Sequence, residues 1–174
     1  MLSFQPSPWY RQIATRMATR SPLKALGTTV FMVLFFWAYF AVLRNPLYPV
    51  TPMPLTWLDS AIPVSGLAFP FYASLWVYAS LPVAFMQHIP SMLRFGAWMA
   101  AMCLLCLAIF WFFPTGVPPS GIDWRLYPEM AVIKDVDTGG NACPSLHVAS
   151  AVFAAVWLGR SEEHTSELQS RQVI

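Results

Sequence analysis

Long apolar runs alternate with proline-rich polar connections along this chain. The first three runs cover residues 25–43, 67–86 and 95–113, and none of them contains Asp, Glu, Lys or Arg. Each run is long enough, at 1.5 Å per helical residue, to cross a bilayer hydrocarbon core of about 30 Å. The pattern therefore predicts three transmembrane helices. The first run is too long for the apolar part of a signal peptide, so we expect it to be retained.

A fourth apolar run begins near Pro144 and stops at Gly159, which is too short to span a bilayer. From Arg160 the composition changes abruptly to the polar string RSEEHTSELQS, which is also the translation of a common short-read sequencing adapter. We therefore expect residues 160–174 to be a non-native tail that replaces the natural sequence beyond Gly159. The tail, including His164, receives no functional role, and we expect the chain as given to be inactive.

These patterns predict an all-α fold, a polytopic transmembrane helix bundle with three full helices and a truncated fourth. We divide the chain into a cytoplasmic N-terminal segment (1–24), a partial transmembrane domain (25–159) and the tail (160–174). The connections at residues 44–66 and 114–143 are rich in proline and glycine, which argues against long regular structure there.

The composition agrees with a lipid environment. Hydrophobic residues make up 57% of the chain and charged residues only 10%, whereas a soluble domain is typically about a quarter charged. The net charge of +2 and the scattered cations argue against a nucleic-acid partner. Cys103 and Cys106 form a C-x-x-C inside an apolar run, which indicates small core or lipid-facing residues rather than a redox pair.

The cations predict an orientation. Five of them lie before the first helix or between the second and the third: Arg11, Arg16, Arg20, Lys24 and Arg94. The connections at residues 44–66 and 114–143 together hold three. Because short cytoplasmic loops are enriched in Lys and Arg, we expect an integral protein of the plasma (inner) membrane with a cytoplasmic N-terminus. The connection at 114–143 then lies on the outer face, whereas His88 lies on the inner side.

The fourth run opens with candidate chemistry, in the string GGNACPSLHVA at residues 139–149. Pro144 suits the first position of a helix, and the N–H groups of a first helical turn form an anion site. Ser145 adds a hydroxyl donor, and His147 can meet a phosphate and transfer a proton. Two other interpretations stay open. A lone interfacial histidine can simply be amphipathic, and a metal site would have only Cys143 and His147 as ligands.

The string CPSLHVASA resembles the second signature of the type 2 phosphatidic acid phosphatase superfamily, especially its inositolphosphotransferase-like branch. The stretch from Asp59 to Pro63, followed by aromatic residues up to Tyr72 and Tyr78, is also similar to that branch. The resemblance implies a six-helix bundle with its active site on the outer face. It implies that His147 is the general acid for the leaving group and that Ser145 contacts phosphate, with no metal or cofactor.

The resemblance also implies residues that are missing. The family's nucleophilic histidine stands in a His-x-x-x-Asp string after the next helix, and none of the three histidines here is followed by such an aspartate. The Lys-x6-Arg-Pro signature of the phosphatase branch is absent too, which favours the phosphotransferase-like branch. Arg125 and Lys134 are the remaining candidates for phosphate binding, although both are also plausible as solvated loop charges. Asp135 and Asp137 are more typical of turns.

The sequence therefore predicts a membrane-embedded lipid phosphate phosphatase or phosphotransferase that forms a phosphohistidine. Its partners are a lipid phosphate substrate and membrane lipids, with the oligomeric state left open. The alternatives are a non-catalytic lipid-binding membrane protein of the same fold and, less favoured, an unrelated membrane fragment.

Overall fold

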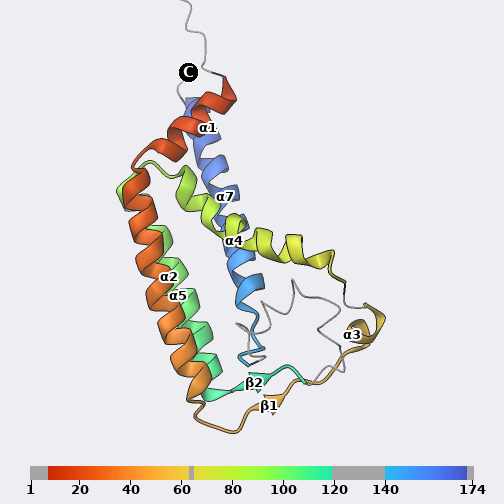
Figure 1. The fold of residues 1–174 in the computed structure, drawn as a ribbon. Coiled ribbons are helices and arrows are strands. Elements are labelled where there is room, and N and C mark those ends of the chain that lie inside the picture. Colours follow the sequence, from red (N-terminus) through yellow and green to blue (C-terminus); the bar gives the residue numbers. More distant parts are fainter. Residues whose placement is uncertain (1–7, 63–64, 119–139, 172–174) are drawn as a thin grey trace, which may run out of the picture.

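The computed structural model describes residues 8–62, 65–118 and 140–171, with the side chains of Ser60 and of residues 161–171 left out of the description. Four long helices dominate it (Figure 1): α2 (Ser21–Arg44), α4 (Ala68–Phe85), α5 (Ile89–Phe112) and α7 (Leu146–Arg171). Helices α2 and α5 lie side by side and run in the same direction, whereas α4 and α7 return in the opposite sense. Helix α4 starts beside the bundle and crosses it obliquely toward the end where α5 begins (Figure 1).

Three of these helices, α2, α4 and α5, are long and apolar enough to cross a membrane, which confirms the three predicted runs. Helix α2 begins at Ser21, four residues before its apolar run, and helix α5 begins at Ile89, six residues before its run. Both early starts carry a proline in the first turn, where the missing N–H costs no helical hydrogen bond. The apolar part of α7 is shorter, as predicted.

The buried core is concentrated on α5. Phe110, Cys106 and Leu107 pack with Val42 of α2 and with Leu146 of α7. A second cluster on the same helix contains Phe95, Met99 and Cys103, with α7 aromatic residues against it. The two cysteines of the C-x-x-C thus belong to the core, as expected. Most other long apolar side chains are exposed, which is the arrangement of helices whose outer surface meets lipid.

The two connections contain short elements of secondary structure, including two strands that the all-α prediction did not include. Strand β1 (Thr51–Pro52) pairs in parallel with β2 (Thr115–Gly116), and Gly116 also forms an antiparallel bridge with Gly140. A short helix, α3 (Trp57–Ala61), follows β1 and is closed by a capping box between Thr56 and Asp59. These contacts tie the connections together at the end of the bundle where α7 begins (Figure 1).

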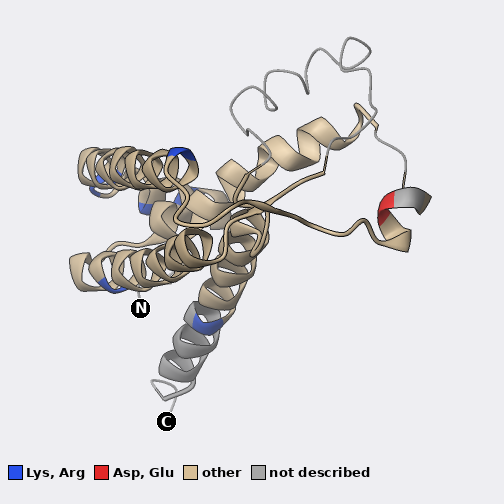
Figure 2. Cartoon of the chain, turned by 90° about the horizontal axis from the view of Figure 1, so that it is seen from below, with Lys and Arg blue, Asp and Glu red and all other residues tan. Residues whose placement is uncertain are grey.

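The N-terminal segment contains a helix that the sequence analysis did not predict. Helix α1 (Trp9–Ala18) is joined to α2 by Thr19 and by Arg20, whose φ of 58° is left-handed. The chain therefore turns sharply between the two helices, and α1 lies across the bundle end in contact with α4 (Figure 1). Among the described side chains Asp59 is the only acidic one, whereas Lys and Arg lie on several helices (Figure 2).

Candidate active site

Helix α7 starts at Leu146, with Ser145 as its N-cap residue. The N–H of Ala149 donates to the Ser145 carbonyl at 2.9 Å, and the N–H of Val148 donates to the Ser145 hydroxyl oxygen at 3.4 Å. Serine is favoured at this position because its side chain accepts an N–H that the helix leaves without a partner. The prediction that Pro144 occupies the first helical position is therefore wrong, because the serine cap displaces the helix start by two residues.

His147 is the second residue of α7, in the first turn as predicted. Its Nε2 lies 2.8 Å from the hydroxyl oxygen of Tyr72 on α4, and the two ring centroids are 4.7 Å apart at 45°. Both side chains are half-buried. The contact joins residues that are 75 positions apart, and it places the imidazole between the start of α7 and the first turns of α4.

The backbone around His147 is held from both sides. Leu146 packs against both core clusters of α5, and the hydroxyl of Ser150 donates to the His147 carbonyl at 3.1 Å. One turn further along α7, Phe153 stacks obliquely on Phe95, with ring centroids 5.3 Å apart. The imidazole is therefore carried by a helix start whose neighbouring residues are fixed in the core.

Thr115 holds the segment that leads into α7. Its carbonyl accepts the N–H of Ala142 at 3.2 Å, and its Oγ1 accepts the N–H of Cys143 at 3.0 Å. Gly140, which bridges to Gly116, lies so close to the side chain of Leu43 that a Cβ at this position would collide with it. The segment before the candidate site is thus hydrogen-bonded to Thr115, just after α5, and lies against Leu43 in the last turn of α2.

Asn141 is a polar residue of this segment that the sequence analysis quoted without assigning it a role. Its φ of 54° is left-handed, a conformation that asparagine adopts more readily than most residues. Its Nδ2 atom is buried and has no hydrogen-bond partner among the described residues. Buried donors are normally paired. This amide is therefore an unusual hydrogen-bond donor, without a described partner, next to the start of α7.

The structure unites some of the predicted site residues and leaves others undescribed. Ser145 and His147 stand together at the start of α7, with Ser145 exposed. Arg125 and Lys134, together with Asp135 and Asp137, fall in residues 119–139 and lie outside the described residues. His88 precedes α5 and is at the opposite end of the bundle from His147, as predicted (Figure 1).

Tyr72 is the functional candidate that sequence reasoning missed. It was noted only as part of an aromatic stretch, because aromatic residues are common in all the apolar runs of this chain. The available signal was its position near the start of one helix, at the same predicted membrane face as His147. Spacing along the sequence does not reveal which of several aromatic residues meets the imidazole.

The geometry allows acid–base chemistry at a helix start. The Tyr72 hydroxyl can donate a hydrogen bond to an unprotonated Nε2 or accept one from a protonated Nε2, because a phenol hydroxyl does both. In either case one imidazole nitrogen is held, and no described residue bonds Nδ1. The first N–H groups of α7 and the Ser145 hydroxyl lie in the same turn and are suited to an anionic group.

No protein-family model, curated protein or solved structure matches this chain.

Proposed function

We propose that this chain belongs to a polytopic membrane enzyme that acts on lipid phosphate esters, either as a phosphatase or as a phosphotransferase. The membrane setting is supported by three helices of sufficient length and apolarity. It is also supported by large apolar side chains that point away from the bundle, such as Val33 (63% exposed), Trp37 (74%) and Leu104 (64%). Such surfaces suit lipid and would be costly in water.

The contact between Tyr72 and His147 is the observation that carries the catalytic proposal. An ionisable side chain among apolar helices is expensive to keep and generally has a function. Here it is oriented by a hydrogen bond at 2.8 Å from another helix, beside a serine and a helix N-terminus. A purely amphipathic histidine needs no such partner.

The proposed reaction has two steps. A second histidine attacks the phosphorus, and the bond from phosphorus to the leaving oxygen breaks as a phosphohistidine forms. His147 gives its proton to the leaving oxygen, with Nδ1 as the transferring nitrogen while Tyr72 holds Nε2. Water or an alcohol then attacks the phosphohistidine, and His147 takes up the proton of the attacking hydroxyl. Ser145 and the first N–H groups of α7 stabilise the phosphoryl oxygens.

The nucleophile in this scheme comes from outside the printed sequence. None of its histidines stands in a His-x-x-x-Asp string, so we propose that the nucleophile belongs to parent sequence that the tail from Arg160 is expected to replace. Sequencing the parent gene past the codon for Gly159 tests this directly. A frame that continues into further apolar helices with such a string supports the enzyme, whereas a frame without it favours a lipid-binding protein of the same fold.

The activity test uses the intact parent protein in lipid vesicles, with phosphate release and head-group transfer from a lipid phosphate ester as the two readouts. His147→Ala should reduce turnover at least about a hundredfold, the usual contribution of a positioned general acid. His88→Ala is the matched control, because this histidine lies at the other end of the bundle and should leave turnover unchanged. Equal activity of both variants would refute the assignment of His147.

A further inference from the structure

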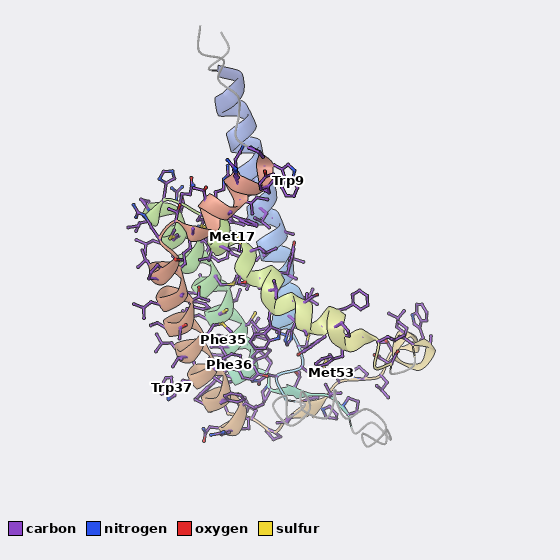
Figure 3. The ribbon with its side chains drawn as sticks, turned by 45° about the horizontal axis from the view of Figure 1, so that its top comes forward. Trp9, Met17, Phe35, Phe36, Trp37 and Met53 are labelled. Atoms are coloured by element: carbon purple, nitrogen blue, oxygen red, sulfur yellow. The ribbon has the colours of Figure 1, made fainter. Side chains whose placement is uncertain are left out.

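Helix α1 has two chemically distinct faces. Trp9, Ile13 and Met17 recur every four residues and therefore share one face, whereas Arg11 and Thr15 lie on the opposite face. The apolar face is open: Trp9 is 73% exposed, Ile13 39% and Met17 48%. Figure 3 shows Trp9 and Met17 on this helix at the end of the bundle. Each of the three side chains keeps at least 39% of its surface exposed, although the Tyr10 ring contacts Trp9 with ring centroids 6.0 Å apart.

A buried lysine fixes the position of this helix. The Nζ of Lys24, near the start of α2, donates to the carbonyl of Arg16 in α1 and to the carbonyl of Ala84 in α4, both at 2.7 Å. Both acceptors lie in the last turn of their helices, where carbonyls lack a partner within the helix. One ammonium group thus joins the ends of α1 and α4 to the start of α2, and α1 is held across the bundle end.

Among the described side chains, all charges at this end of the bundle are positive. Arg11 and Arg16 lie on α1, and Arg20 is in the turn that follows it. The sequence contains no Asp or Glu before Asp59, which is in α3 near the other end of the molecule (Figure 2). The helix therefore combines an open aromatic and aliphatic face with two cations, Arg11 on the opposite face and Arg16 at the edge of the apolar face, and no described carboxylate lies near them.

We propose that α1 is an interfacial helix that lies in the head-group region of the bilayer and binds anionic phospholipids. Short amphipathic helices with Trp on one face and Arg on the other occupy this zone, with the apolar face buried in the head-group boundary. Polybasic segments next to a membrane helix are attracted to anionic lipids. Helix α1 leads through the turn at Thr19 and Arg20 into α2, one of the helices suited to cross the bilayer, so its cations stand where that helix leaves the hydrocarbon.

The inference goes beyond the proposed catalysis, because α1 is at the opposite end of the bundle from His147. It depends only on the membrane setting of α2. The test must therefore separate failure of the membrane setting from failure of the interfacial helix.

Spin labels on the full chain in nanodiscs provide this test. Single cysteines replace Met17 on the apolar face, Thr15 on the polar face and Val33 in the middle of α2, in a Cys143→Ser background. The two remaining cysteines are buried in α5, and the background spectrum is subtracted. Collisions with oxygen report lipid, and collisions with a nickel chelate report water. The nanodiscs contain phosphatidylcholine with or without phosphatidylglycerol.

The label at residue 17 should show a severalfold higher oxygen-to-nickel ratio than the label at residue 15, and the label at residue 33 the highest ratio of the three. Arg11→Gln combined with Arg16→Gln should lower the ratio at residue 17 in nanodiscs with phosphatidylglycerol and change it less in phosphatidylcholine alone.

Equal exposure of residues 15 and 17 to nickel, with residue 33 still in lipid, overturns the interfacial helix. A label at residue 17 shielded from both reagents indicates a protein partner and also overturns it. An effect of the arginines that is independent of phosphatidylglycerol overturns the anionic preference. Exposure of residue 33 to nickel refutes the membrane setting and this inference with it.

Discussion

Helix α4 is fastened at both of its ends by a side-chain hydrogen bond to another long helix, but the two bonds differ in their chemistry. Near its start, Tyr72 meets His147 of α7. Near its end, the carbonyl of Ala84 accepts from Lys24 of α2. The first bond joins two side chains that can each donate or accept. The second joins a cation to backbone carbonyls, which can only accept.

The difference separates a contact of the candidate site from a contact that joins helix ends. Lys24 satisfies two carbonyls that the ends of α1 and α4 would otherwise leave unpaired, so its role is complete within the described structure. The pair at the other end consists of two side chains that can each donate or accept a hydrogen bond, and it lies near the exposed Ser145 and near Asn141, whose amide nitrogen has no partner among the described residues. The two ends of α4 therefore differ. The hydrogen bond at one end supports packing, whereas the hydrogen bond at the other end belongs to the candidate site.

Replacement of Lys24 should give the largest change in stability. Lys24→Met keeps the length of the side chain and removes the donor to both carbonyls. Hydrogen bonds to charged groups contribute about 1.5–3 kcal/mol, so we expect the free energy of unfolding to fall by about 2 kcal/mol. Denaturant titration in detergent micelles measures this, with Arg11→Met on the exposed face of α1 as the control. Equal stability of the two variants would show that the Lys24 bonds are dispensable.

Replacement of Tyr72 tests the hydrogen bond near the start of α4. Tyr72→Phe removes the hydroxyl and keeps the ring next to the imidazole. We expect a loss of about 1 kcal/mol in stability, the usual net contribution of one hydrogen bond, and a fall in turnover of the intact parent by about fivefold. Tyr78→Phe on the same helix is the matched control and should change neither quantity. If Tyr72→Phe lowers stability but leaves turnover unchanged, this contact is structural like that of Lys24.

The smallest expected effect concerns the capping box of α3, a helix that takes part in neither of the two contacts of α4. The side chain and the backbone N–H of Thr56 each donate to Asp59 at 2.7 Å, and these bonds lower the pKa of the Asp59 carboxyl. A lowered pKa means that the contribution is present above the pKa of the unfolded state and is lost as pH falls through the folded value. Hydrogen exchange of residues 55–62 should therefore show weaker protection in acid, after correction for intrinsic rates. Asp59→Asn should remove that dependence, and a variant that keeps it would exclude the carboxyl as its source.

Parts of the candidate site were open to prediction and parts were not. The position of His147 in a first helical turn, next to Ser145, follows from local signals: two glycines, a proline and a serine before an apolar run. The same signals wrongly placed Pro144 at the first helical position. Proline and serine are both common at helix starts, and only the hydrogen bonds of Val148 and Ala149 to Ser145 distinguish their roles. Tyr72 escaped because its contact crosses 75 positions.

The number and approximate positions of the long apolar helices followed from the sequence, because a helix satisfies its own backbone hydrogen bonds and a helix suited to a membrane needs only length and apolarity. The short helix α1 was missed because it has polar residues on half of its surface, and a search for unbroken apolar runs passes over it. Contacts between helices depend on which faces meet, and the exposed side chains of these helices are as apolar as the buried ones. For this reason the choice of α5 as the central helix, the lysine that joins three helix ends and the pairing of Tyr72 with His147 emerged only in three dimensions.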